Sequence, residues 1–425
     1  MASVKIHGPT GVLLVDGQKV FPIGISDPPP SNGRAPSGEH AYQELANGGI
    51  TMIRSGTPDW APAKIDQQIA RERELQISAA THGLKCWMRL GPVANLPGPA
   101  ANKQLLQKIV TAFKSSPALC AYKGVDEPRN PFRGAKWIRP AGLVAAHARV
   151  KALDPAHPLV IIQAPRSPVS QLVPYRPAFD ITGVDIFPIA YPPGLHADTD
   201  NADISVVGDM AAKMKEASGG KPVWMTLQVA WSGVAPSKEN PGIVPRFPSL
   251  PQERFMAYQA IVNGARGLVF FGGHLTEICT PDDAKAGWNW TFWRQVLRPV
   301  VHELSSSQLR PALLAPDAKI PVRVKPHSSG ATDVELVVRR AGKYLYVIAV
   351  RRGGSPARVE FTGLPKRQNG AALTKGEVLF EYVQRPLPMP ERPDKQVPRP
   401  VKVSAGGFRD WFSAHDAHVY RFDLA

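Results

Sequence analysis

Short apolar runs recur along the first two thirds of the chain, and segments that contain Pro and Gly separate them. Near-continuous apolar runs of this length are typical of strands that are buried on both faces of a sheet. The pattern therefore predicts eight buried strands: Val20–Ser26, Ile50–Arg54, Leu84–Leu90, Leu119–Val125, Leu159–Gln163, Ile181–Phe187, Pro222–Gln228 and Gly267–Phe271.

The segments between these runs carry apolar residues at helical spacing, as Ile65, Ile69 and Ala79 do. Strands that alternate with helices over about 250 residues predict an α/β fold, the (β/α)8 TIM barrel. A doubly wound open sheet is the alternative, although no Gly-x-Gly-x-x-Gly motif follows an early strand. The predicted helices are 63–80, 102–113, 141–153, 204–218 and 252–265.

The pattern changes at both ends of this region. Gly11–Val20 predicts a hairpin that turns at Asp16-Gly17, and we expect it to close the barrel floor. Trp293–Leu304 is the last predicted helix, so the barrel domain is expected to span 1–306. Alternating and β-branched runs follow, and they predict a small antiparallel β-sandwich over 307–425. Its predicted elements are strands at 332–340, 343–350, 358–362, 377–383 and 418–424, and a loop or extended segment at Arg385–Pro400.

Charge is the strongest bias in the composition. The 425 residues include 51 Lys and Arg but 35 Asp and Glu, a net charge of +16. Such a surplus of positive charge suggests that nucleic acid or another anionic polymer is a partner. Residues 311–425 hold 19 Lys and Arg against 11 Asp and Glu, half of the surplus. Because no dense basic run, zinc finger or helix-turn-helix signature accompanies it, we predict no nucleic-acid partner.

Other features exclude further classes of protein. Three Cys make no disulfide scaffold, and we expect Cys86 and Cys120 to be buried free thiols. No apolar run approaches the ~20 residues of a membrane-spanning helix. No cluster of His, Cys and carboxylates has metal-ligand spacing, so we predict no metal and no cofactor. Met1–Ile6 contains no apolar signal segment, which predicts a cytoplasmic protein or one whose signal has been removed.

Catalytic side chains of such barrels lie at the carboxyl ends of the strands. The sharpest feature there is Asp126-Glu127-Pro128, directly after the fourth strand. Pro128 restricts Glu127 to an extended backbone, which would aim its side chain into the barrel mouth. The other strand ends carry Asp27, Arg54, Arg89, Gln163, Asp185, Gln228, His274 and Glu277.

Two carboxyl groups that flank one bond are what glycoside hydrolysis requires. One protonates the leaving oxygen, and the other attacks the anomeric carbon or activates water. Asp126 would raise the pKa of its neighbour Glu127 and suit Glu127 to proton donation. The alternative is that both residues cap a loop or pair with Arg129.

Several segments resemble the (β/α)8-barrel retaining glycoside hydrolases. FPIGI and NGGITMIRSG are similar to the first two barrel strands of this clan, and YKGVDEP is similar to the segment with its acid/base Glu. Other similar segments are VDIFPIAYP, MAYQAIVNGARGLVFFG, GWNWTFWRQVLRPVVHEL and FRDWFSAHDAHVYRF. The resemblance implies a glycosidase with a C-terminal β-sandwich, Glu127 as acid/base and Arg54 as the support of the nucleophile.

The chain departs from this clan at strand seven, where Gln228 stands in place of the nucleophilic Glu. Residues 217–238 contain no Asp or Glu, so a small shift of register supplies none. Asp185 is the first candidate for the second carboxylate, ahead of Glu277 and Asp27. Otherwise the chain is a non-catalytic carbohydrate-binding protein on a degenerate barrel.

Aromatic residues favour a sugar site, because the C–H faces of sugars stack on aromatic rings. Core packing is the alternative for each of them, and a structural role is the alternative for a lone His. The candidate substrate-binding residues are Arg54, Asp126, Gln228, Tyr191, Trp231, Trp290 and His274.

The sequence thus predicts a glycoside hydrolase for an oligo- or polysaccharide, anionic ones included, with Glu127 and Asp185 as the catalytic pair. The resemblance also implies a secreted or periplasmic protein, as many polysaccharide-degrading members of the clan are. A structural protein that binds a partner through its basic β-domain is a further alternative.

Overall fold

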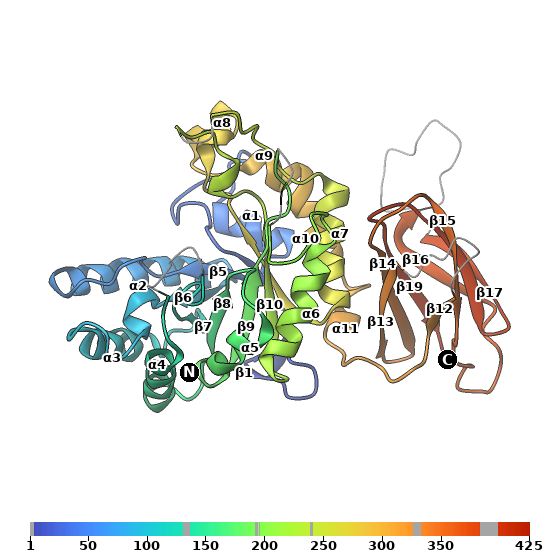
Figure 1. Cartoon of the computed structure of the whole chain (residues 1–425), viewed down its shortest axis with the longest axis horizontal. Helices are drawn as coiled ribbons and strands as arrows, with labels where there is room; N and C mark the ends of the chain where they lie inside the picture. Colours follow the sequence, from blue (N-terminus) through green and yellow to red (C-terminus); the bar gives the residue numbers. More distant parts are fainter. Residues whose placement is uncertain are drawn as a thin grey trace.

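The computed structural model of the chain describes residues 4–130, 137–191, 194, 196–238, 241–325, 333–382 and 398–425. A barrel comes first along the chain, and a β-domain lies beside it (Figure 1). Across these described residues, no helix combines the length and the apolar character that crossing a membrane requires.

Eight parallel strands close into a barrel in the order β10-β11-β4-β5-β6-β7-β8-β9. All eight predicted strands are confirmed, and the closure excludes the doubly wound open sheet. The strands are β4 (Ile23–Ile25), β5 (Met52–Ser55), β6 (Lys85–Arg89), β7 (Leu119–Lys123), β8 (Leu159–Gln163), β9 (Ile181–Asp185), β10 (Val223–Gln228) and β11 (Ala265–Phe271).

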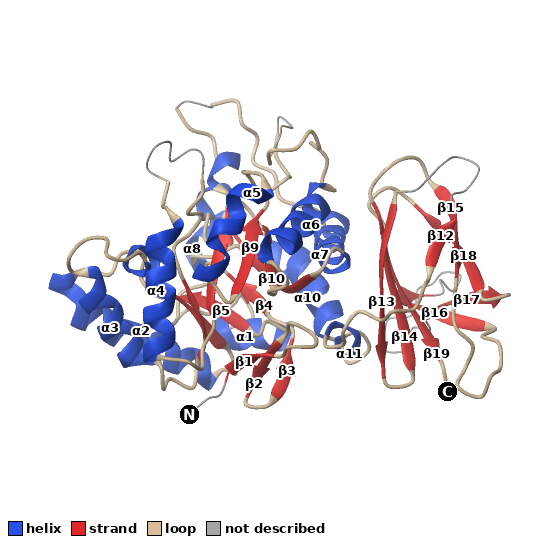
Figure 2. Ribbon diagram, turned by 60° about the horizontal axis from the view of Figure 1, so that its bottom comes forward, coloured by secondary structure: helices blue, strands red, loops and turns tan. Residues whose placement is uncertain are grey.

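Helices surround the barrel (Figure 2). The five predicted ones correspond to α2, α3, α4, α6 and α7, and the predicted last helix opens as a π-helix at Trp293–Leu297 before it continues as α10. The helices are α1 (Ala41–Gly48), α2 (Ile65–Thr81), α3 (Asn102–Phe113), α4 (Pro140–Leu153), α5 (Val169–Leu172), α6 (Val206–Ser218), α7 (Leu250–Val262), α8 (Pro281–Ala286), α9 (Trp290–Phe292), α10 (Arg298–Ser305) and α11 (Arg310–Leu313).

Apolar side chains fill the space inside the barrel strands. Met52, Cys120 and Ile162 are buried there together with Trp87 and Trp224. The two indole rings meet edge to face, with centroids 5.9 Å apart. Large rings from strands on different sides of the barrel thus fill its axis, which makes the barrel interior a packed core rather than a pore.

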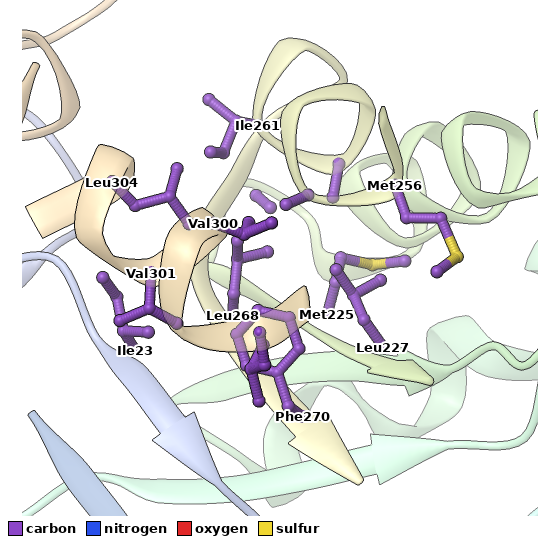
Figure 3. Packing of buried hydrophobic residues seen from close by; sticks show 14 of the residues in the cluster. Ile23, Met225, Leu227, Met256, Ile261, Leu268, Phe270, Val300, Val301 and Leu304 are labelled. Atoms are coloured by element: carbon purple, nitrogen blue, oxygen red, sulfur yellow. The ribbon is translucent and has the colours of Figure 1, made fainter. Parts of the chain in front are cut away.

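A second apolar layer lies between the strands and the outer helices (Figure 3). Met256 and Ile261 come from α7, and Val300 and Leu304 come from α10. They pack against barrel-strand residues such as Leu268 of β11. This layer holds α7, which also contacts the β-domain through β13, β14 and β19.

A three-stranded antiparallel sheet closes the barrel floor, as predicted. It consists of β1 (Val4–Ile6), β2 (Leu13–Val15) and β3 (Gln18–Val20). Asp16 and Gly17 turn between β2 and β3 with φ of +51° and +80°, the positive values that a two-residue hairpin turn needs. Leu13 of this sheet is buried in the same cluster as Met52 of the barrel interior.

The β-domain has eight strands in the order β12-β15-β18-β17-β16-β19-β14-β13, folded into two layers. The five predicted strands are confirmed as β13 to β16 and β19. Residues 385–397 of the predicted Pro-rich loop lie outside the described residues. Residues 398–400 begin β17, so of the two predicted alternatives the loop is wrong there and the segment is extended. Pro398 starts the strand at an irregular register, where a missing N–H is tolerated. The strands are β12 (Arg323–Lys325), β13 (Val334–Ala341), β14 (Tyr344–Arg351), β15 (Ala357–Thr362), β16 (Lys375–Tyr382), β17 (Pro398–Ser404), β18 (Gly407–Phe412) and β19 (Ala417–Asp423).

The layer with β13, β14 and β19 packs on α7 of the barrel. A polar network reinforces this contact: Arg352 pairs with Asp209 of α6 (2.7 Å) and with Glu335 of β13 (2.9 Å). Gln259 and Asn263 donate to the same Glu335 carboxylate at 3.0 Å each. The two domains therefore share an apolar and a hydrogen-bonded interface.

Candidate active site

A cavity of about 450 Å³ opens at the carboxyl ends of the barrel strands, a volume within the usual range for small-ligand sites. It brings together five of the predicted site residues: Arg54, Asp126, Glu127, Asp185 and Trp231. The other lining residues are Ser26, Trp87, Lys123, Asn130, Ala164, Pro165, Arg166, Phe187, His196, Thr226, Ser232 and Phe271.

Glu127 lies in the turn after β7 and has a left-handed backbone, with φ of +43°. Its N–H donates to the carbonyl of Ile162 in β8 (2.9 Å), and its carbonyl accepts from the N–H of Asn130 (3.1 Å). The predicted extended backbone is therefore wrong, because these two bonds outweigh the restriction from Pro128. A non-Gly residue held at positive φ costs about 1–3 kcal/mol, and such strain clusters at functional sites.

The carboxylate of Glu127 is held by a neighbour in the same turn. Asn130 Nδ2 donates to Glu127 Oε2 at 2.8 Å. The predicted alternative, a pair with Arg129, is absent from the described contacts, and Arg129 donates to Gln171 instead (2.8 Å). The turn thus fixes Glu127 at the cavity wall.

Lys123 is the last residue of β7, and its side chain is only 3% exposed. Its ammonium pairs with the carboxylate of Asp126 and lies 5.5 Å from the ring centroid of Trp87. Burial lowers the pKa of Lys123, and Asp126 offsets part of this effect. Burial alone would raise the pKa of Asp126, but Lys123, aided by Arg54 and Arg89, outweighs it and lowers that pKa. Both directions follow from one buried ion pair.

Asp185 ends β9 beside Thr226 of β10, its partner in the parallel register. Burial raises the pKa of Asp185 well above its usual value, and the charges of Asp126 and Glu127 raise it further, against the opposing effect of Lys123. The sequence predicted that Asp126 would raise the pKa of Glu127, and this stays a prediction; in the structure the charge of Asp126 raises the pKa of Asp185. When two neighbouring carboxyl groups have different pKa values, the protonated one can act as the acid and the ionised one as the base or nucleophile.

Arg54 extends from the end of β5 and pairs with the carboxylate of Asp27, which follows β4. Trp288 Nε1 donates to the backbone carbonyl of Asp27 at 2.8 Å. His274 Nδ1 lies 3.6 Å from the second carboxylate oxygen of Asp27, which has no hydrogen-bond partner among the described residues. Arg54 was expected to support a nucleophile on strand seven. The structure pairs it with a carboxylate from the neighbouring strand instead.

Three aromatic rings form one wall of the cavity. Phe187 stacks on Phe271, with centroids 5.2 Å apart, and lies 6.4 Å from Trp231. His196 meets Trp231 edge-on at 6.2 Å. Trp231 Nε1 and His196 Nε2 are buried without a hydrogen-bond partner among the described residues. Buried polar atoms of this kind call for a partner, which a ligand hydroxyl would supply.

Four predicted substrate-binding residues do not line this cavity. Gln228 is fully buried, and its amide exchanges hydrogen bonds of 2.7 and 2.8 Å with the backbone of Ile189. Trp290 is fully buried against Trp288, with ring centroids 4.8 Å apart. Tyr191 is 49% exposed outside the cavity. His274, the fourth, contacts Asp27. The side chains of Gln228 and Trp290 thus lie in the protein interior and not at the cavity where substrate contacts were predicted.

Several lining residues were not predicted from the sequence, among them Lys123, Thr226, Arg166 and His196. Lys123 lies within the YKGVDEP segment, three positions before Asp126, so a search for a cation near the carboxylates would have found it. Thr226 lies inside a strand, two residues before its end. Arg166 and His196 come from loops, where no strand-end rule applies.

Solved structures of carbohydrate-active barrels resemble the whole chain. A protein described as a glycoside hydrolase superimposes with a TM-score of 0.61 at 12% identity, covering 100% of this chain and 97% of that one. The chain has the fold of the (β/α)8-barrel glycoside hydrolases. A family 5 glycoside hydrolase from Bacteroides vulgatus gives 0.61 at 11% identity over 99% and 93% of the two chains. A family 30 endoxylanase from Clostridium papyrosolvens gives 0.51 at 12% over 99% and 99%. No protein-family model and no curated protein matches the sequence.

Proposed function

We propose that the chain hydrolyses a glycosidic bond of an oligo- or polysaccharide in the cavity at the barrel mouth. The observation that carries this proposal is that Glu127 and Asp185, from different strand ends, line one cavity together with the aromatic wall. A sugar ring stacked on Phe187 or Trp231 would present its anomeric carbon to two carboxyl groups, the minimum that glycoside hydrolysis requires.

In the proposed reaction, Glu127 gives a proton to the oxygen of the leaving sugar as the glycosidic bond breaks. Asp185 acts at the anomeric carbon, either as the nucleophile that forms a glycosyl ester or as the base that takes a proton from the attacking water. In the first case a water molecule then attacks the ester, Glu127 takes a proton from this water, and Asp185 is released as a carboxylate. Arg54 and Asp126 line the cavity and would form hydrogen bonds with the hydroxyl groups of the sugar.

One observation favours exchanged roles for the two carboxyl groups. Burial raises the pKa of Asp185, which suits a proton donor, and Glu127 accepts a hydrogen bond from the amide of Asn130. In the exchanged assignment Asp185 donates the proton and Glu127 is the nucleophile or base. Both assignments use the same pair.

Aryl glycosides separate the two assignments. A dinitrophenyl leaving group needs no proton, so the variant that lacks the acid keeps its first chemical step on this substrate and loses it on an unactivated glycoside. The variant that lacks the nucleophile or base loses both. We expect E127Q to show the first behaviour and D185N the second; the reverse result establishes the exchanged roles. Loss of neither activity in either variant overturns the proposal.

A non-catalytic carbohydrate-binding protein is the second candidate, because β10 ends in Gln228 and supplies no carboxylate. The decisive measurement is a screen of the purified protein against neutral and anionic polysaccharides, with detection of reducing ends. Retention on a polysaccharide without any product favours this second candidate. A product that disappears in E127Q favours hydrolysis.

We also propose that the protein works outside the cytoplasm, since polymeric substrates of such enzymes are extracellular. Fractionation of the source cells with an antibody to the chain tests this. Detection in the cytoplasmic fraction alone contradicts it.

A further inference from the structure

One layer of the β-domain has a face turned away from the barrel. Strands β12, β15, β18 and β17 form this layer in that order, and Figure 2 shows them on the side of the domain opposite to β13. Phe361, Phe408 and Phe412 of these strands are buried, and the alternate positions Arg409 and Trp411 of β18 are exposed. We call the outward side of these four strands the outer face.

The outer face is strongly cationic. Glu360, its acidic side chain, pairs with both Lys325 (3.1 Å) and Arg409 (2.8 Å), so its charge is more than balanced. Arg358 and Lys402 take part in no ion pair among the described residues. The charged residues at outward positions of the four strands are Arg323, Lys325, Arg358, Glu360, Lys402 and Arg409.

Cations of the outer face line a hollow, and an exposed tryptophan lies next to one of them. Lys325, Arg358, Lys402 and Arg409 line this surface hollow of about 590 Å³ together with Glu360. Trp411 lies on β18 directly opposite Arg358 of β15 in the antiparallel register. Its side chain is 62% exposed, which makes it the exposed member of the chain's nine Trp. An exposed indole ring offers a stacking surface, and the cations beside it offer partners for carboxylates.

We propose that the outer face binds a polyuronate, an acidic polysaccharide with carboxylates along its length. The sugar ring would stack on Trp411, and the carboxylates would pair with Arg358, Lys402 and Arg409. The choice of a polysaccharide rests on the proposed glycosidase function. It also rests on the single aromatic ring, since single-stranded nucleic acids bind to several rings that take successive bases. The site retains the polymer and takes no part in bond cleavage.

The experiment measures binding alone, so that it does not depend on hydrolysis. The full chain with E127Q migrates through native gels that contain polygalacturonate, its methyl ester, or no polymer. The ester keeps the sugar backbone and removes the charge. The same E127Q background then carries W411A, or R358Q with K402Q, or the matched control K64Q with K103Q. Lys64 and Lys103 are exposed on the barrel. Equal thermal melting confirms that every variant is folded.

We expect polygalacturonate to retard the chain and the methyl ester to retard it much less. W411A and the R358Q/K402Q pair should weaken binding at least about tenfold, and the K64Q/K103Q control should leave it unchanged. Raising NaCl from about 50 to about 500 mM should weaken binding as well.

Four results would overturn the proposal: no retardation by polygalacturonate, equal retardation by the ester, equal loss in the control pair, or unchanged binding in W411A. Tighter binding to an oligo(dT) strand, lost in the same variants, would identify a nucleic-acid face instead. Hydrolysis of a short oligosaccharide is assayed separately in chains with Glu127 intact. Its absence refutes the proposed glycosidase without affecting the binding result.

Discussion

The buried pair of Lys123 and Asp126 allows a stability prediction that probes the electrostatics of the cavity. Lys123→Met keeps an unbranched side chain of similar length and removes the ammonium. Asp126 then loses the main cation that lowers its pKa, while Asp185 loses the cation that opposes its own raised pKa. We therefore expect both carboxyl groups to ionise less readily in this variant.

The magnitude follows from the exposure of the two partners. Removal of one member of a buried ion pair costs about 3–5 kcal/mol, because the other charge stays behind. The Lys123 side chain is 3% exposed, but the Asp126 side chain is 28% exposed, so water solvates part of the remaining carboxylate. We therefore expect the lower end, about 3 kcal/mol, or a fall of about 6 °C in the melting temperature of the barrel.

Urea unfolding at neutral pH, followed by tryptophan fluorescence, measures this loss. The double variant K123M/D126N leaves no buried charge at this position, and we expect it to recover most of the stability. K343M is the control, since Lys343 and Asp423 form a pair in which both side chains are largely exposed; it should change nothing measurable. A loss below about 1 kcal/mol in K123M, or no recovery in the double variant, would refute the reasoning.

Three further predictions concern the same barrel. E127Q should lower kcat about 10²- to 10⁴-fold on whichever polysaccharide yields product, measured as initial rates. The pKa of Asp185 is raised in the folded chain, so folding is favoured while Asp185 is protonated. This contribution to stability is complete below the pKa of Asp185 in the unfolded chain and is lost as pH rises through its pKa in the folded chain. D185N lacks this loss, so its free energy of unfolding should rise relative to that of the parent chain from about pH 4 upward. Urea unfolding at a series of pH values measures this. A difference in stability that stays constant with pH would contradict the prediction. G183A should unfold or precipitate, because a Cβ there would lie 1.6 Å from the carbonyl oxygen of Trp224, whereas G242A, with open space around it, should melt like the parent.

The barrel strands were predictable because each is buried on both faces, so its run is apolar at nearly every position. The strands of the β-domain were harder to predict from the sequence. In β18 the inward side includes Asp410, which pairs with Arg399 of β17 and breaks the apolar alternation. β12 has only three residues, and β17 contains two Pro. Strands whose inward residues are polar, or which are very short, carry no sequence pattern of their own.

The site was predictable as far as it depends on topology. The ends of barrel strands meet at one mouth, and this brought Arg54, Glu127 and Asp185 to one cavity. The pairing of side chains was not predictable, since Lys123 and its contact with Asp126 depend on local packing. The sequence does not distinguish a Trp that lines a cavity, such as Trp231, from one that lies in the core, such as Trp290, because both occur in loops that follow a strand.

The interface between the domains limits how the proposed enzyme can work on a large substrate. Arg352 bridges α6 and β13, and α7 lies against β14, so ion pairs and packing join the two domains in one arrangement. If the outer face holds a polymer, the barrel mouth reaches only segments at one fixed offset from the point of attachment. On insoluble material the rate of cleavage would then be limited by desorption, and a tighter grip would slow the enzyme rather than speed it.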